Sequence, residues 1–522
     1  MGDGGPTVSP QAQASHKSPF VLAIDVGSSS VKAALYDARA RVVEGSEARQ
    51  AHLLHTASDG TAEKIAEHVM DSVEQVVDAV LERTGGEAKH IAAVGIDTLA
   101  STLLGLDGDG KPITPIYTYA DTRSRDDVDQ LRRELDVRAL YQRTGCPQHT
   151  AYLPGRLRWL QRTCPDIVRR VHRWVDVGTF LYTRWFGRSD VPASYSIASM
   201  TGLLDRHRLQ WDEELLHYLS LSVDALPPLA DYTHAQRELT APFANRWPTL
   251  HSVPFFLAVG DGAAANVGSG CVSPGRVALT VGTSGAMRVL LPDSAPHVWP
   301  GLWAYRLGKA YTLLGGSFSE GGNVFAWARS TLQLPPREEL ERALQALPPN
   351  GHGLRVLPFL AGERSPGWST SAAGAIEGLK VSTTPMEIVQ ACLEAVAYRF
   401  ALVEKLLQDY VGESCQIIAS GGAIVNSPYW LQVMADVLQR SIVVSREKED
   451  TSRGTAILAL HALSIWPTLE TVPAELGATY QPDTQRAPVY QKSIEKQHKL
   501  YDTLIGHDAE IDQRLAETKR GN

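Results

Sequence analysis

The sequence predicts an α/β protein of two related halves, each built on a mixed sheet that helices cover. Two stretches with the same pattern, residues 21–36 and 279–290, each join two apolar runs through a short turn of Gly, Ser and Thr. Such long-range similarity predicts two related halves rather than a short-period repeat. In the first half, strand-like and helix-like stretches alternate, as in a mixed sheet with packed helices. The length of 522 residues exceeds one typical core and predicts two or three domains.

The composition argues against several classes of protein. A net charge of −8 is unlike a nucleic-acid binder, which usually carries a basic face. No segment approaches the roughly 20 apolar residues that a membrane span needs. The five cysteines are scattered and never form a Cys-x-x-Cys pair, which predicts a reduced, cytoplasmic protein with cysteines as core residues. The sequence leaves open whether the chain acts alone or as a homodimer.

Changes in composition divide the chain into four parts. Residues 1–18 are rich in Gly, Pro, Ser and Gln without an apolar segment, which predicts a disordered tail rather than a signal peptide. We place a first domain at 19–252, because a polar stretch ending near Trp247-Pro248 resembles a boundary. A second domain follows at 253–466, and a charged helical extension at 467–522.

The first turn has the chemistry of an anion site. Glycine lets the backbone come close, and small hydroxyls donate hydrogen bonds without bulk, so a phosphate is the natural guest. A carboxylate beside a phosphate needs a bridging cation, so Asp25 implies Mg²⁺. An ordinary surface hairpin explains this stretch equally well when it is taken alone. The turn consists of Gly27, Ser28, Ser29 and Ser30.

The second turn, Gly282-Thr283-Ser284, favours the phosphate interpretation. It follows an apolar run just as the first turn does, and another apolar run comes after it. Two such tips that face each other would hold one polyphosphate.

Polar residues follow the buried strand predicted at 91–96. Asp97 and Thr98 come where side chains of an α/β sheet usually meet ligand, although a cap on the next turn explains Asp97 at least as well. A helix is predicted before this strand, over 62–81. Asp121 and Arg123 lie beside tyrosines and could bind a polyol, but their spacing alone favours a solvated helix cap.

In the second half, an apolar strand delivers Asp261 into a run of glycines and alanines. A carboxylate without bulky neighbours is suited to be a general base, and this role is compatible with a cap on a helix that starts near Gly262. The glycines of 315–323 and 421–422 could let a nucleotide lie against backbone. Residues 360–368 are predicted to form an ordered, functional turn. A P-loop, a strict dinucleotide-binding fingerprint, a zincin motif and a nucleophile elbow are missing from the sequence.

Taken together, these motifs resemble those of the FGGY carbohydrate kinases, which have the actin-like ATPase fold. The resemblance covers about residues 20–505. It implies two ribonuclease H-like domains with a cleft between them, the first binding mainly sugar and the second mainly ATP. The matching motifs are Asp25–Lys32, Ala120–Ser124, Gly260–Ala264, Gly282–Gly285 and Gly421–Asn426.

The resemblance also assigns roles. Asp261 matches the catalytic base, and Asp25 matches the carboxylate that holds Mg²⁺ through water, with Asp261 close to the same metal. The expected sugar-binding residues are Asp97, Thr98, Asp121, Arg123 and Asp261. The expected ATP-binding residues are Gly27, Ser28, Ser29, Ser30, Lys32, Gly282, Thr283, Ser284, Gly322, Gly422 and Asn426.

Within the family, three stretches are most similar to gluconokinases: 119–124, 199–212 and 360–368. This similarity implies transfer of the γ-phosphoryl group of ATP to D-gluconate, giving 6-phosphogluconate. Tyr119 stands where many relatives have Trp, so xylulokinase or another pentulose or polyol kinase is the alternative. A nucleotide-dependent binding protein on the same fold is the alternative without enzymatic activity.

Overall fold

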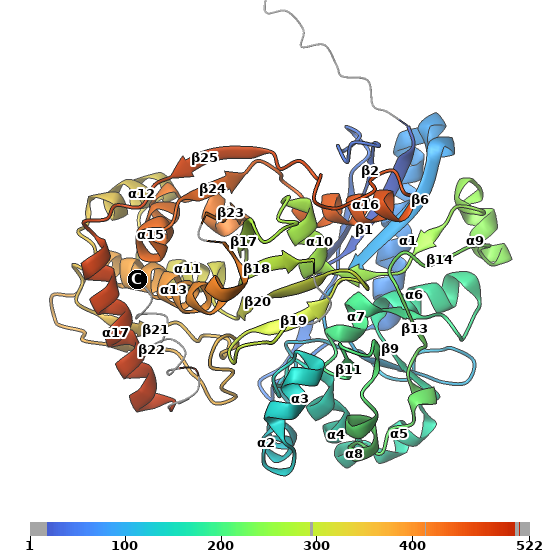
Figure 1. The fold of residues 1–522 in the computed structure, drawn as a ribbon, viewed down its shortest axis with the longest axis horizontal. Coiled ribbons are helices and arrows are strands. Elements are labelled where there is room, and N and C mark those ends of the chain that lie inside the picture. The colour runs from blue at the N-terminus through green and yellow to red at the C-terminus, as the bar shows by residue number, and fades with distance from the viewer. Residues whose placement is uncertain (1–17, 293–295, 413, 507–510, 512–522) are drawn as a thin grey trace, which may run out of the picture.

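The chain forms two α/β lobes that meet along a shared core (Figure 1). This computed structural model describes residues 18–292, 296–412, 414–506 and 511. Each lobe is built on a seven-stranded mixed sheet, as the alternation of strands and helices predicts. The predicted tail lies outside the described residues except for Ser18. The predicted domain boundaries stay a prediction.

The first sheet contains the first predicted hairpin. β1 (Phe20–Val26) lies antiparallel to β2 (Ser30–Tyr36) and parallel to β6 (Ile91–Thr98). The predicted strand at 91–96 is therefore confirmed and runs on to Thr98. The other strands of this sheet are β3 (Ala48–Ala51), β14 (Ala235–Gln236), β15 (Phe255–Phe256) and β16 (Val259–Gly260).

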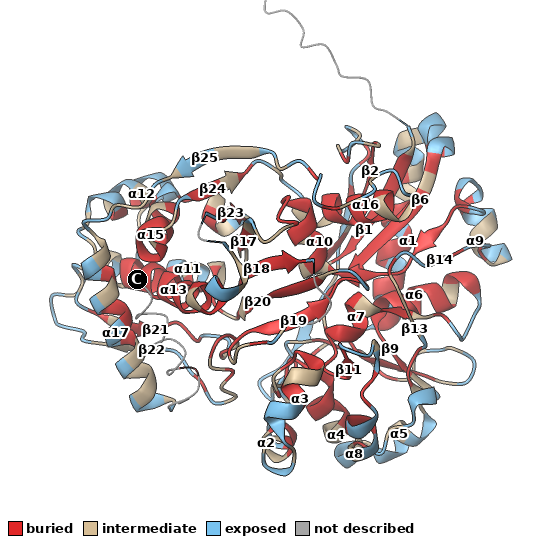
Figure 2. Cartoon of the chain, viewed as in Figure 1, coloured by how far each residue is buried: buried red, intermediate tan, exposed pale blue. Residues whose placement is uncertain are grey.

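Both faces of β1 are covered, so that every one of its residues is buried (Figure 2). Successive side chains of a strand point to opposite faces. Leu22 and Ile24 pack in the core of the first lobe, whereas Val21 and Ala23 pack in the core that both lobes share. The alternation therefore directs Asp25 towards the second lobe.

The helix predicted over 62–81 begins later than expected. α1 (Ala66–Thr84) does bury Val69, Val73 and Val77 along one face. Residues Ala62–Lys64, however, form β5, which pairs with β8 (Ile116–Tyr117). β5 also pairs with the nearby β4 (His55–Thr56), and its three residues are too few to show a strand pattern against the helical one.

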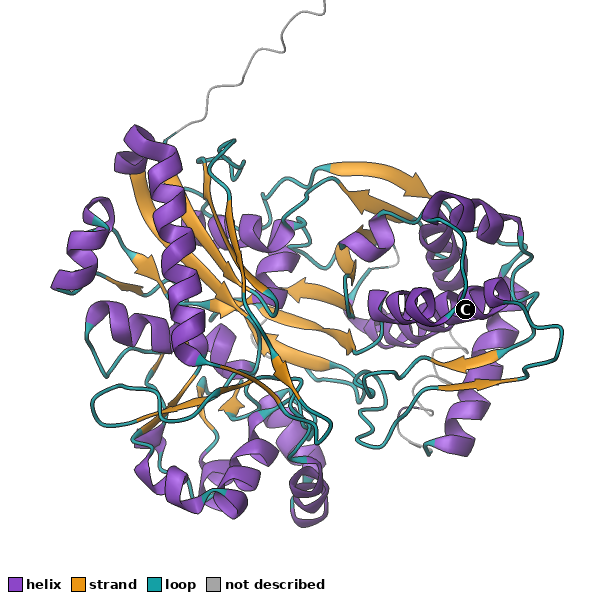
Figure 3. Ribbon diagram, turned by 180° about the vertical axis from the view of Figure 1, so that it is seen from behind, coloured by secondary structure: helices purple, strands orange, loops and turns teal. Residues whose placement is uncertain are grey.

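The second sheet repeats the arrangement of the first. β17 (Arg276–Val281) and β18 (Gly285–Leu291) form the second predicted hairpin, and β17 has a parallel neighbour in β23 (Gln416–Ser420) just as β1 has in β6. Helices flank both sheets (Figure 3). The other strands are β19 (Trp303–Arg306), β20 (Thr312–Phe318), β24 (Ile442–Ser445) and β25 (Leu476–Tyr480).

Two helices cross between the lobes at very short range. α10 (Asp261–Gly268) and α16 (Asp450–Ala462) pack against each other, and α16 also covers the inner face of β1. A Cβ atom on Gly268 would lie 1.7 Å from the carbonyl oxygen of Asp450, and one on Gly454 would lie 1.8 Å from that of Ala264. Only glycine fits at these two positions, because the backbones are in contact.

We therefore expect Gly454→Ala to lower the free energy of unfolding by about 1 to 3 kcal/mol, because the added methyl group must push the helices apart. Chemical denaturation followed by circular dichroism would measure the change. Gly86→Ala is the matched control, since a Cβ atom there meets no atom within 4 Å. Equal stabilities of the two variants would contradict this account of the crossing.

The remaining elements surround the sheets. The predicted extension 467–522 is helical in α17 (Ala487–Leu504), but β25 precedes this helix and pairs with β24, so part of the segment belongs to the second sheet. In the first lobe the other elements are β4 (His55–Thr56), η1 (Gly85–His90), β7 (Leu104–Leu106), α2 (Arg125–Glu134), α3 (Val137–Thr144), α4 (Leu153–Thr163), α5 (Pro165–Arg170), β9 (Arg173–Val175), α6 (Val177–Phe186), β10 (Ala193–Ser194), α7 (Tyr195–Ser199), β11 (Leu204–Asp205), β12 (Gln210–Trp211), α8 (Glu213–Tyr218), η2 (Val223–Ala225), β13 (Leu229–Ala230), α9 (Ala241–Arg246) and η3 (Pro248–Leu250). In the second lobe they are α11 (Gly322–Thr331), α12 (Arg337–Ala346), β21 (Arg355–Leu357), β22 (Ala375–Glu377), α13 (Pro385–Leu407), η4 (Gln408–Tyr410), α14 (Gly422–Val425) and α15 (Pro428–Leu438).

Candidate active site between the two lobes

The tips of the two hairpins line one cleft of about 930 Å³. Ser28 and Ser29 come from the first tip, and Gly282, Thr283 and Ser284 come from the second. Residues that are far apart in the sequence are thus brought to one space. Their backbone and hydroxyl groups can converge on an anion from both lobes.

A glycine turn supports the second tip. The amide of Gly322 donates to the carbonyl of Gly282 over 2.8 Å, and the amide of Asn323 donates to that of Thr283 over 2.9 Å. A Cβ atom on Gly322 would lie 2.5 Å from the carbonyl oxygen of Gly282, so this approach requires glycine. Asn323 lines the cleft, whereas Gly322 does not.

The glycine pair at the start of α14 is close to the same hairpin. Gly421 has a φ of 92°, and a Cβ atom on it would lie 2.5 Å from the carbonyl oxygen of Val281. Asn426 donates from Nδ2 to the carbonyl of Gly422 over 2.7 Å. Neither Gly422 nor Asn426 lines the cleft, so their role in nucleotide binding stays a prediction.

A second cavity of about 250 Å³ adjoins the cleft. Both lobes contribute to it, and its walls are largely aromatic. Its three charged residues, Asp261, Arg288 and Arg364, also line the larger cleft and therefore stand where the two spaces join. The residues that characterise this inner cavity are Ser101, Tyr119, Tyr152, Met200, Asp261, Arg288, Trp303, Tyr305, Arg364 and Trp368.

Asp261 is the first residue of α10, and its Oδ1 accepts a hydrogen bond from the amide of Gly262 over 2.7 Å. Burial raises the pKa of this carboxyl above its ordinary value, and the charges of Arg288 and Arg364 oppose the rise. A Cβ atom on the preceding Gly260 would lie 2.3 Å from the end of the Met200 side chain, so a larger residue there would have to displace that side chain. A carboxylate at the junction of two cavities can exchange a proton with a group bound in either.

Two arginines flank Asp261, and the sequence analysis gave neither a role. Arg288 donates from Nη1 to the carbonyl of Gly262 over 2.6 Å, and Arg364 donates to the carbonyl of Phe318 over 2.5 Å. Arg288 could have been noticed as the one charge within the apolar strand β18. Arg364 lies in the loop 360–368, which the sequence predicts to be functional.

Asp25 and Asp97 are neighbours on parallel strands. Asp97 is fully buried, and its Oδ2 accepts a hydrogen bond from Thr455 over 2.6 Å. Burial, together with the charge of Asp25, raises the pKa of Asp97 well above its ordinary value. Asp97 and Thr98 line neither cavity, so their predicted contact with sugar stays a prediction.

The surroundings of Asp25 fit a divalent cation. Burial raises the pKa of Asp25 to about 6, Lys32 lowers it, and the nearby Asp261 carboxylate raises it further. Oδ1 of Asp97 has no hydrogen-bond partner among the described residues. Mg²⁺ prefers carboxylate and water oxygens, and would neutralise this concentration of acidic groups. In the described ranges no three His, Cys, Asp or Glu side chains are grouped so as to hold a metal ion, and the binding of Mg²⁺ by Asp25 through water stays a prediction.

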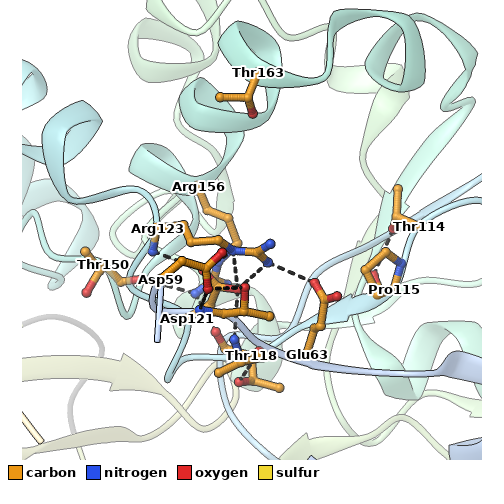
Figure 4. A network of polar contacts seen from close by, with 12 residues as sticks. Asp59, Glu63, Thr114, Pro115, Thr118, Asp121, Arg123, Thr150, Arg156 and Thr163 are labelled. Carbon is orange, nitrogen blue, oxygen red and sulfur yellow. Dashed lines mark hydrogen bonds and ion pairs between the residues drawn. The ribbon is translucent and has the colours of Figure 1, made fainter. Parts of the chain in front are cut away.

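Asp121 and Arg123 are hydrogen-bonded to each other and do not reach the inner cavity (Figure 4). Nε of Arg123 lies 3.1 Å from both Asp121 oxygens, and Nη2 donates to Glu63 over 2.8 Å. The guanidinium lies 4.5 Å from the ring centre of Trp159. Asp121 also accepts a hydrogen bond from the amide of Ala62. Neither side chain lines either cavity, so the geometry supports a role in holding this loop, and their sugar binding stays a prediction.

Three further predicted ATP-binding residues have their partners outside the cleft. Nζ of Lys32 donates to Glu449 over 2.5 Å, which joins β2 to the start of α16. Ser30 is buried, and its hydroxyl accepts a hydrogen bond from Arg49. Gly27 closes the turn by donating to the carbonyl of Ser30 over 3.1 Å. None of these three predicted residues lines the cleft.

Two mixed sheets that present matching hairpins across a cleft, with a carboxylate between two cavities, define the fold as that of the actin-like ATPases. The chain belongs to the FGGY family of carbohydrate kinases. The family model for the N-terminal domain matches residues 20–268, and the model for the C-terminal domain matches residues 277–463. The protein is therefore a phosphotransferase with an alcohol acceptor, which disfavours the alternative of a mere binding protein.

Known relatives cover nearly the whole chain but differ in substrate. Gluconokinase of Bacillus subtilis (strain 168) is 27% identical over 93% of this chain and 94% of the relative. Glycerol kinase of Stenotrophomonas maltophilia (strain R551-3) is also 27% identical, over 92% and 96%.

Similar solved structures likewise include kinases of different substrates. Gluconate kinase from Lactobacillus acidophilus superimposes with a TM-score of 0.86 at 25% identity, covering 96% of this chain and 99% of that one. Xylulose kinase from the same organism gives a TM-score of 0.86 at 26% identity, covering 93% and 98%. These similarities do not decide which alcohol accepts the phosphoryl group, and the inner cavity is the part of the site that would select it.

No helix among the described residues is long and apolar enough to cross a membrane.

Proposed function

We propose that this protein is an ATP-dependent kinase of a sugar acid, with D-gluconate as substrate and 6-phosphogluconate as product. One observation carries the choice of a sugar acid. The charged residues that line the inner cavity are Asp261, Arg288 and Arg364, one carboxylate against two guanidinium groups. A cavity with one excess positive charge suits a substrate with one negative charge.

The two arginines have different contacts, and we assign them different roles. Arg288 donates to the carbonyl of Gly262, next to the base, and its charge favours the ionised form of Asp261. Arg364 lies with its guanidinium 5.6 Å from the ring centre of Tyr119. Within the described ranges no carboxylate forms an ion pair with Arg364, so its remaining donors are available to the carboxylate of a substrate.

The aromatic walls suit the carbon chain of a polyol. Trp303 and Tyr305 stack with ring centres 4.1 Å apart, and the hydroxyl of Tyr305 is hydrogen-bonded to that of Tyr152 over 2.7 Å. Flat rings exclude water from the carbon faces of a sugar, while a few polar groups fix its orientation. Asp261 then lies beside the hydroxyl that enters the cleft.

The residues of the site would promote phosphoryl transfer chiefly by holding the acceptor hydroxyl and the phosphates of ATP in position. Asp261 accepts the proton of the terminal hydroxyl as that oxygen attacks the γ-phosphorus of ATP, while the bond from this phosphorus to the β–γ bridging oxygen breaks and ADP leaves. Ser28, Ser29, Thr283 and Ser284 hold the phosphate oxygens from both lobes. Asp25 would hold Mg²⁺ through water, and the bound ion would neutralise charge on the phosphates.

Xylulokinase or another pentulose or polyol kinase is the second candidate, because gluconate, xylulose and glycerol kinases all occur among the similar proteins. A neutral acceptor would leave the carboxylate-binding donors of Arg364 unpaired in the cavity. Arg364 is half-buried, and a charged group that loses water without gaining a partner is costly, so such an acceptor should be used poorly.

The test is release of ADP from Mg·ATP by the purified protein with D-gluconate, D-xylulose, D-ribulose, L-ribulose, glycerol or no acceptor. We expect kcat/KM for D-gluconate to exceed that for each neutral acceptor by at least about 100-fold. A preference for a ketose or for glycerol would contradict the sugar-acid proposal while leaving the kinase intact.

A further inference from the structure

A buried lysine and a histidine hold the backbone of the first hairpin tip. Nε2 of His52 lies 3.1 Å from the carbonyl oxygen of Gly27, and the backbone amide of His52 donates to the carbonyl of Ser29 over 3.1 Å. Nζ of Lys64 donates to the carbonyl of Ser28 over 2.8 Å. Three consecutive carbonyls at the tip are therefore bound from one side.

This arrangement decides where the amides of the tip point. In a planar trans peptide the C=O and N–H groups point in opposite directions. Because the carbonyls of Gly27 and Ser28 point to His52 and Lys64, the amides of Ser28 and Ser29 point the other way. Both serines line the cleft, and neither amide donates to an acceptor in the part of the chain that the structure describes. Two N–H groups that have no acceptor among the described residues thus lie at the proposed phosphate site, where an anion would accept from them.

The contact between Lys64 and His52 determines which nitrogen of the His52 ring carries the proton. Nζ of Lys64 lies 2.8 Å from Nδ1 of His52. An ammonium group can only donate, so Nδ1 must be the acceptor and the ring proton must be on Nε2, where it donates to Gly27. Burial and the charge of Lys64 lower the pKa of His52 to about 4, which agrees with a neutral ring. Lys64 is only 3% exposed, and burial lowers its pKa to about 8, so it is still mostly charged at pH 7.

We infer that Lys64 and His52 are positioning residues for the phosphates of ATP: they fix the amides of Ser28 and Ser29 towards the cleft and place a positive charge behind them. This inference rests on the proposed function of the cleft. His52 lines the cleft beside Ser28 and Ser29, whereas Lys64 lines neither cavity, and neither residue was among the predicted site residues. No local pattern indicates the pair, because His52 lies in the loop after β3 and Lys64 lies in β5, and the two meet only through the fold of the first lobe.

The first experiment compares Lys64→Met with wild type by calorimetric titration with Mg·ADP and with the non-hydrolysable analogue Mg·AMPPNP. Loss of a charge-assisted hydrogen bond at the tip should weaken nucleotide binding about 10- to 100-fold, while the KM for the sugar changes less than about twofold. Lys64→Arg, which keeps the charge and a donor, should recover part of the affinity. Lys89→Met is the matched control, since Lys89 is exposed and lies outside both cavities.

The second experiment measures the protonation state of the His52 ring directly, in the absence of nucleotide. Nitrogen-15 NMR of the histidine rings, with the signal of His52 assigned through its loss in His52→Gln, should show the Nε2-protonated neutral form at pH 7 in wild type. In Lys64→Met the pKa of His52 should rise, because the neighbouring positive charge has gone. Circular dichroism of each variant separates loss of the fold from loss of the contact.

The outcomes distinguish the inference from the proposed function. Normal nucleotide affinity in folded Lys64→Met would overturn the inference and leave the kinase proposal standing. An Nδ1-protonated or charged His52 in wild type would overturn it as well. Failure of the wild-type protein to bind either nucleotide would instead overturn the proposed function of the cleft.

Discussion

Replacing Asp261 by Asn should lower kcat by about 10²- to 10⁴-fold, because the acceptor hydroxyl loses its general base. The amide oxygen of Asn can still accept the hydrogen bond from Gly262, so the start of α10 should keep its geometry. Affinity for Mg·AMPPNP should therefore change only about twofold. Steady-state release of ADP measures the first effect, and calorimetric titration measures the second.

Asp126→Asn is the control for this substitution, since Asp126 is an exposed residue in the first turn of α2 that lines neither cavity. It removes the same charge and should leave turnover unchanged. If Asp261→Asn keeps turnover within about threefold of wild type, the base must be another group. A loss of nucleotide affinity that matches the loss in kcat would instead assign Asp261 to the binding of Mg·ATP.

Local patterns predicted the parts of the fold that local chemistry decides. Both hairpins carry apolar runs around turns of small residues, and their equivalent places in two sheets follow from that shared pattern. Asp25 and Asp261 could be singled out because each comes at the end of an apolar strand, where a sheet of this kind opens to ligand. The start of α1 was misplaced because β5 is only three residues long, and its pairing with β4 and β8 rather than a pattern of its own decides its conformation.

The candidate site was harder to predict wherever a distant partner decides what a side chain does. Spacing alone could not show that Glu63 neutralises Arg123, or that Thr455 binds Asp97 across the boundary between the lobes. For Asp121 and Arg123 the family resemblance pointed to sugar, while the structure shows an ion pair beside Trp159. Conversely, Arg364 has no periodic signature, since it lies in a loop and reaches the cavity only through the fold.

Arg364 is also the residue on which the choice of substrate depends most directly. If it pairs with the carboxylate of the sugar acid, Arg364→Met should lower kcat/KM for D-gluconate by about 10²- to 10³-fold, the usual cost of leaving one partner of a buried charge pair alone. The low activity with D-xylulose or glycerol should change less than about fivefold, since these acceptors have no carboxylate. Affinity for Mg·AMPPNP should stay close to that of wild type.

Two further variants make this result specific. Arg364→Lys keeps the positive charge but loses the planar pair of donors, so its kcat/KM for D-gluconate should lie between those of wild type and Arg364→Met. Arg329→Met removes an exposed arginine near the end of α11 and should have no effect on any acceptor. An equal loss for charged and neutral acceptors in Arg364→Met would mean that Arg364 shapes the cavity, through its contacts with Phe318 and Tyr119, rather than binding a carboxylate. Since Asp261 and Arg288 already balance each other in charge, that result would remove the reason for preferring a sugar acid over a neutral polyol.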